Sequence, residues 1–199
     1  MRKVTHVLFA LIATLTCGSV LAHGGAGSHL HSGFETGFMH TVTGLDHVVV
    51  MLSVGLWSAL SARRTGRAML WGPLGFTNML LLGTTLGLQG VEVAAVEPLI
   101  AASLVTVGLL VVTKMQLQGV WAAALVGLFA VFHGLAHGHE LAENAQAFEV
   151  LAGLVCATVM LHGTGLGLGH LLRGAPVWVP RTIGAAVAIL GSSFLLPLN

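Results

Sequence analysis

Long apolar runs separated by short polar segments dominate the sequence from residue 37 onward. Each run is close to the ~20 residues that a helix needs to cross a bilayer. Because backbone polar groups inside a bilayer must be paired within their own segment, each run is expected to be helical. The pattern predicts an all-α membrane protein whose residues 37–199 form a six-helix transmembrane bundle. The expected spans are 37–60, 69–89, 96–113, 119–137, 147–171 and 179–197.

A different pattern precedes the first span. Residues 1–22 combine a positive start (Arg2 and Lys3), an apolar middle and a small-residue site that ends at Ala22. These features are typical of a cleavable signal peptide, although an uncleaved first transmembrane helix is the alternative. Cleavage after Ala22 would leave His23 as the first residue, and its α-amine and imidazole could chelate a metal together.

Residues 23–36 form a His- and Gly-rich segment that is expected to be irregular. Export of the N-terminus would make this segment periplasmic. His23, His29 and His31 could then capture a metal ion before it enters the membrane. A solvated linker accounts for the same composition, so both interpretations stay open.

The distribution of charge sets the orientation of the spans. Only 8% of the residues are charged, whereas soluble domains have about a quarter. A net charge of +1 and the lack of a basic stripe give no reason to expect nucleic-acid binding. The positive-inside rule places both mature termini in the periplasm. On that assignment the inner loops hold Arg63, Arg64, Arg67, Lys114, Arg173 and Arg181, and the outer side holds Glu35, Asp46, Glu92, Glu97, Glu140, Glu143 and Glu149.

Histidines are the main source of candidate chemistry, because there are eleven of them against seven acids. In a continuous helix His133, His137 and Glu140 share one face, at i, i+4 and i+7. Two imidazoles and a carboxylate suit a borderline divalent transition metal. The HExxH zinc-protease motif is not present here, since no glutamate follows His133. Gly134 and Gly138 could instead break the helix, and His139 would then turn inward.

A second cluster opens the first span. His40 and His47 are seven residues apart, so they would lie on one face of a continuous helix, with Asp46 about 100° away. Ionisable groups inside a membrane usually mark function. Asp46 could be a ligand or could orient an imidazole. The alternative is a helix cap with histidines at the level of the lipid headgroups.

Three further groups fall in other spans. Glu97 begins the third span, where it could be a ligand or a proton acceptor, or could only stabilise the helix dipole. His162 near mid-membrane and His170 near the inner end could continue a polar path toward the cytoplasm. Hydrogen bonds to a neighbouring helix would explain these two histidines as well.

The two clusters carry a resemblance to a known family. The motifs are H-x5-D-H, here His40 to His47, and F-H-G-x-A-H-G-x-E, here Phe132 to Glu140. With these motifs the chain resembles the HupE/UreJ family of hydrogenase- and urease-associated membrane proteins over most of residues 34–172. One difference is Thr41, where the family typically has proline, and this could alter the bend at the start of the span.

The resemblance implies a nickel permease, in some members a cobalt permease, of the bacterial inner membrane. It also implies that the six groups of the two motifs bind metal and that Glu97 is an intramembrane acid. The implied metal-binding residues are His40, Asp46, His47, His133, His137 and Glu140. Ligand chemistry alone does not select nickel over cobalt, zinc or copper.

The expected function is therefore a multi-pass permease and not an enzyme. It would import Ni2+, with Co2+ or Zn2+ as other possible ions, would need no organic cofactor, and would serve hydrogenase or urease maturation. One alternative is an intramembrane zinc hydrolase that uses His133, His137 and Asp46 with a metal-activated water. Another is a metal-binding membrane accessory protein that does not transport.

Overall fold

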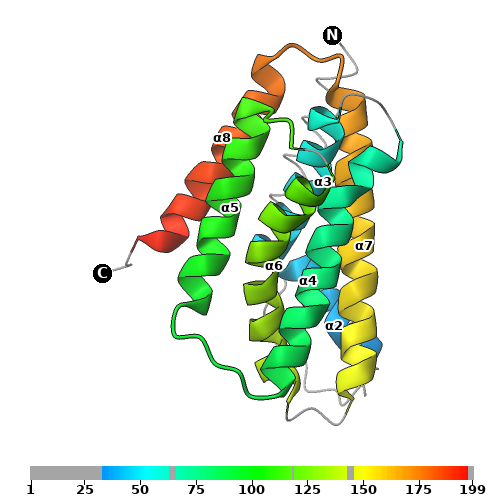
Figure 1. The fold of residues 1–199 in the computed structure, drawn as a ribbon, viewed down its shortest axis with the longest axis vertical. Coiled ribbons are helices and arrows are strands. Elements are labelled where there is room, and N and C mark those ends of the chain that lie inside the picture. The colour runs from blue at the N-terminus through cyan, green and yellow to red at the C-terminus, as the bar shows by residue number, and fades with distance from the viewer. Residues whose placement is uncertain (1–32, 63–65, 118, 143–145, 197–199) are drawn as a thin grey trace, which may run out of the picture. The chain divides into compact units, whose positions relative to one another are not determined.

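A computed structural model describes residues 33–62, 66–117, 119–142 and 146–196 (Figure 1). The expected signal peptide and the histidines at positions 23, 29 and 31 lie outside the described residues. Every regular element within these ranges is a helix, so the all-α prediction is confirmed. The elements are α2 (Gly33–Thr43), α3 (Leu45–Ser61), the 3-10 helix η2 (Arg67–Leu70), α4 (Trp71–Leu88), α5 (Val96–Thr113), α6 (Val120–Leu141), α7 (Ala147–Leu172) and α8 (Trp178–Leu195).

The helices have the length and composition of a multi-pass membrane protein. Four of them, α5 to α8, are long and apolar enough to cross a bilayer, and the α2–α3 pair is a fifth candidate if it forms one bent span. Helix α4 is as long as α5, but Pro73 and Asn78 make it less apolar. The count of six spans therefore stays a prediction.

The first expected span is not one continuous helix. It breaks at Gly44, where the backbone is extended (φ −68°, ψ 115°), and α2 and α3 meet at 75°. The expectation that His40 and His47 stack along one helix face is wrong for this reason. Helix α2 also begins at Gly33, so residues 33–36 are helical and not irregular as expected.

Glycines allow the helices to pack at close range. A β-carbon on Gly134 would meet the Leu80 carbonyl oxygen of α4, and one on Gly138 would meet the Thr84 carbonyl oxygen. Small residues of this kind let the backbones of two membrane helices approach closely. Helix α6 runs unbroken through both glycines. The suggested break there is wrong because these residues serve the α4–α6 contact.

Successive long helices alternate in direction, so the loops gather at two ends of the bundle (Figure 1). The α3, α5 and α7 C-termini share one end. There the Trp57 indole N–H donates to the Met115 carbonyl (3.0 Å), and the Arg173 guanidinium donates to the carbonyls of Ala59 (2.8 Å) and Ala62 (2.7 Å). This end, called the basic end below, carries Arg67, Lys114, Arg173 and Arg181. The opposite end holds the α2–α3 bend and the C-terminus of α6.

Candidate metal centre

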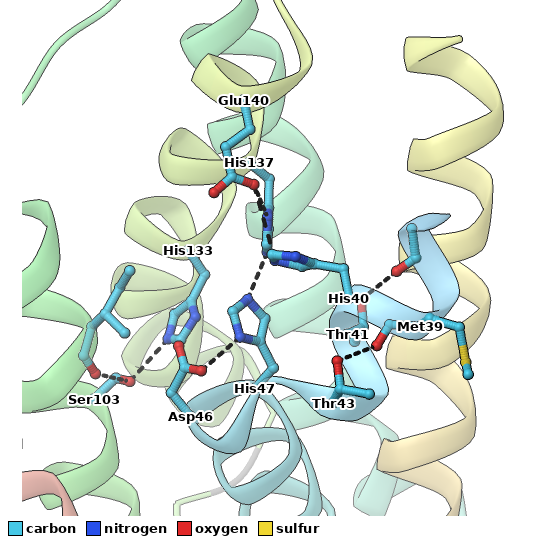
Figure 2. Close-up of polar contacts among 12 residues, drawn as sticks. Met39, His40, Thr41, Thr43, Asp46, His47, Ser103, His133, His137 and Glu140 are labelled. Carbon is cyan, nitrogen blue, oxygen red and sulfur yellow. Dashed lines mark hydrogen bonds and ion pairs between the residues drawn. The ribbon is translucent and has the colours of Figure 1, made fainter. Parts of the chain in front are cut away.

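Six of the predicted site residues converge at the end of the bundle opposite the basic end (Figure 2). Helix α2 supplies one of them, the first turn of α3 supplies two, and the last nine residues of α6 supply three. Helices α2 and α3 both pack against α7, and the bend at Gly44 brings the rings of His40 and His47 together beside His137 of α6. These residues, called the histidine cluster below, are His40, Asp46, His47, His133, His137 and Glu140.

The centre of the histidine cluster is a pair of imidazoles from helices far apart in the chain. The Nε2 atoms of His47 and His137 are 2.7 Å apart. Asp46 Oδ1 lies 2.9 Å from Nδ1 of His47, and Glu140 Oε2 lies 3.4 Å from Nδ1 of His137. Because an ionised carboxylate can only accept a hydrogen bond, these partners assign the proton to Nδ1 of both rings. Two Nε2 lone pairs then face each other, an arrangement that is stabilised by a cation between them, either a proton or a metal ion.

His133 is the deepest member of the histidine cluster and has no solvent exposure. Its Nε2 lies 3.0 Å from the hydroxyl of Ser103 on α5, and that hydroxyl donates to the Ile100 carbonyl at 2.6 Å. Ser103 must therefore accept a hydrogen bond from Nε2–H of His133, which leaves a lone pair on Nδ1. This Nδ1 is buried with no hydrogen-bond partner among the described residues. An unpaired buried acceptor costs about 1–3 kcal/mol, so Nδ1 is available for an ion.

Ser103 was not predicted as a site residue. The only signal in the sequence is a hydroxyl within the apolar third span, and many such hydroxyls bond only to their own helix. Its position across from His133 follows from the packing of α5 against α6.

The ligand atoms form two overlapping groups of three. His40, His47 and His137 make one group, and Asp46, His47 and His133 make the other. Within each group the potential ligand atoms lie within 4.8 Å of one another. We call these the outer and the inner set, because the His40 side chain is 46% exposed and His133 is fully buried. His47 belongs to both sets.

The donor set suits a first-row divalent ion. Imidazole nitrogen with carboxylate oxygen is a common environment for nickel, cobalt, zinc and copper. Two nitrogens at 2.0–2.1 Å from a metal, at a right angle, are about 2.9 Å apart. The observed 2.7 Å between the Nε2 atoms of His47 and His137 is close to this value.

A pocket of about 160 Å³ lies beside the outer set. His40 and Glu140 line it on the exposed side, and Glu140 has 61% of its side chain exposed. The other lining residues are Thr36, Gly37, His137, Leu141, Val150 and Leu154. An ion can therefore reach the outer set from solvent past a carboxylate.

Other predicted residues lie outside the histidine cluster. Glu97 is exposed on the first turn of α5, and no hydrogen bond or ion pair within the described ranges joins it to the histidine cluster. His139 points away and donates to the Val91 carbonyl at 2.7 Å. His170 is exposed in the last turn of α7, whereas His162 is buried in the middle of α7.

The substitution of threonine for the family's proline at position 41 does not set the bend. Thr41 lies within α2, where its hydroxyl donates to the Gly37 carbonyl, and the bend comes at Gly44.

Comparison with known proteins agrees with the two motifs that form the histidine cluster. The family model described as HupE / UreJ protein matches residues 11–194. The chain belongs to the HupE/UreJ family. One relative in this family, Protein HupE of Rhizobium leguminosarum bv. viciae, is 37% identical over 195 residues, which cover 98% of this chain and 97% of the relative. No solved structure matches the chain.

Proposed function

We propose that this HupE/UreJ protein is an inner-membrane permease that imports a divalent transition metal, with Ni2+ as the preferred ion and Co2+ as the second. The imported metal serves hydrogenase or urease maturation. The observation that carries the proposal is the pair of three-ligand sets that share His47 and run from exposed to buried positions. A resident cofactor needs one closed site, whereas a transported ion needs successive sites.

The graded exposure suggests an order of events. The ion meets Glu140 and His40 at the pocket and loses part of its water shell there. It then binds between His47 and His137 and displaces the proton that these two rings share, and this proton leaves to solvent through the pocket beside Glu140. The ion then moves into the inner set while it stays on His47. In this step Asp46 and His133 replace His40 and His137 as ligands. Exchange of one ligand at a time keeps the ion coordinated throughout.

The topology is part of the same proposal. The signal peptide is removed after Ala22, the α2–α3 pair forms a broken first span, and α4 forms the second of six spans. Both mature termini then lie in the periplasm, and the histidines at positions 23, 29 and 31 collect the ion. Broken helices near the substrate are common in transporters. The exposed Glu97 is assigned to the outer mouth, where its carboxylate attracts cations.

Influx into vesicles tests the proposed function. The purified protein is reconstituted into metal-free vesicles that hold a metal-sensitive dye, and Ni2+ influx is followed with and without competing Co2+ or Zn2+. We expect Ni2+ influx well above that of empty vesicles, and stronger inhibition by Co2+ than by Zn2+. No influx of any ion would contradict the permease. Stoichiometric, tightly bound zinc without influx would instead favour the zinc hydrolase.

A further inference from the structure

Four side-chain atoms in the described ranges are buried without a hydrogen-bond partner, and they belong to three residues. They are Nδ1 of His133, both ring nitrogens of His162 and the hydroxyl of Ser58. We propose that His162 and Ser58 form an inner binding station for the transported divalent ion, between the histidine cluster and the basic end. The proposal rests on the proposed function and extends it to the second half of the path.

Phe76 links His162 to the histidine cluster. His162 is 3% exposed on α7, and its ring packs edge-on against Phe76 of α4, with ring centroids 5.2 Å apart. Phe76 also contacts His133, with ring centroids 5.7 Å apart. One buried aromatic ring therefore contacts both the innermost imidazole of the histidine cluster and His162. Apolar constrictions of this kind act as barriers in channels and transporters, so Phe76 keeps the two stations distinct.

Ser58 continues the line toward the basic end. A β-carbon on Gly72 would meet the Ser58 hydroxyl, so Ser58 faces α4 at that level. Gly72 is four residues before Phe76, which places it about 6 Å nearer the basic end along α4. The three residues that carry these unpaired atoms thus come from α6, α7 and α3, and each contacts the face of α4 that holds Gly72 and Phe76.

The lack of hydrogen bonds sets these residues apart from other buried polar groups. Buried threonines at 41, 84 and 158 each donate to a carbonyl one turn earlier in their own helix. The Ser58 hydroxyl does not. The backbone of Thr158 lies near the His162 ring, but not in hydrogen-bonding geometry.

Unpaired buried polar atoms are costly, so each needs an explanation. Transient binding of the transported ion is an explanation that fits all three residues. One neutral imidazole and one hydroxyl bind a divalent ion weakly, which favours release to the cytoplasm over retention.

The test compares influx with equilibrium binding. His162→Phe is expected to lower Ni2+ influx into vesicles by about tenfold or more, as for any lost ligand in a rate-limiting passage. Ni2+ affinity of the purified protein, measured by equilibrium dialysis, should change by less than about twofold because the histidine cluster is intact. His162→Gln supplies an amide oxygen that can still bind the ion through a lone pair, so it should retain more influx than His162→Phe. Thr164→Val, an exposed change on the same helix, should behave as wild type.

Two results would overturn the inner station. One is wild-type influx by His162→Phe. The other is joint loss of affinity and influx in both His162 variants, which would make His162 a structural support of the histidine cluster. If His162→Phe does not fold, Ser58→Ala is judged by the same two measurements: lowered influx with unchanged affinity supports the inner station, and wild-type influx overturns it. Absence of influx in the wild-type protein would overturn the proposed function itself, so the two failures are distinguishable.

Discussion

The two regions that supply the histidine cluster position their ligands in different ways. The α2–α3 region contributes three ligands around a break at Gly44, whereas α6 contributes three from one face of an unbroken helix. Both regions contain glycine between their ligands. In the first region the glycine changes the direction of the chain, and in the second it does not.

The surroundings of each glycine explain the difference. Gly134 and Gly138 face the backbone of α4, so the neighbouring helix occupies the space that a side chain would need. A β-carbon on Gly44 would instead lie 2.8 Å from Nδ1 of His47, within its own segment. Glycine in a membrane helix therefore indicates either a bend or a close helix–helix contact, and the position of the neighbouring helix decides which.

Loss of an imidazole at the shared centre has the largest expected effect. His47→Ala, or His137→Ala on the unbroken side, should reduce Ni2+ accumulation by about 100-fold or more, because each loss removes a ligand and leaves a buried partner unpaired. Membrane insertion, followed by immunoblot of the membrane fraction, should be unchanged. His139→Ala, which removes a histidine outside the histidine cluster, is the matched control. Normal accumulation by both variants would reject these ligand assignments.

A side chain added at the bend should have the second-largest effect. Gly44→Ala should weaken Ni2+ binding by about 10–100-fold, as is usual when the support of a ligand is disturbed. The added carbon would displace His47 and also approach Asp46 Oδ1, 3.4 Å away. Equilibrium dialysis of the purified variant measures this change. An unchanged affinity would show that the break at Gly44 does not position His47.

The support of His133 on the unbroken side is expected to matter less. Ser103→Ala removes the acceptor that assigns the proton to Nε2 of His133, so Ni2+ affinity should fall by about tenfold. Ser103→Thr keeps the hydroxyl and should retain most of the affinity. Equal affinities of these two variants would argue against an orienting role for the hydroxyl.

A packing glycine that touches none of the ligands should affect stability more than binding. A β-carbon on Gly75 would lie 2.6 Å from Cβ of Ala123, so α4 and α6 must separate. Gly75→Ala should lower the free energy of unfolding by about 1–3 kcal/mol. Thermal unfolding of the detergent-solubilised protein, with Ni2+ affinity measured in parallel, checks both parts. If Gly75→Ala lowered Ni2+ affinity more than Gly44→Ala, the packing glycine and not the bend would control the position of the ligands.

The sequence by itself determined the features that depend on local pattern. Apolar runs of bilayer length predicted helices, and the spacing of His133, His137 and Glu140 predicted a shared face on α6. The two motifs predicted the family. These inferences succeed because helix periodicity and hydrophobicity are properties of neighbouring residues.

Only the tertiary structure decided how the helices meet. It placed His47 against His137 across 90 residues, brought Ser103 to His133, put the bend at Gly44 and left Glu97 apart from the histidine cluster. These outcomes depend on the register in which helices pack, and that register is set by glycine contacts between distant segments. No local pattern in the chain records which glycine will find a partner helix.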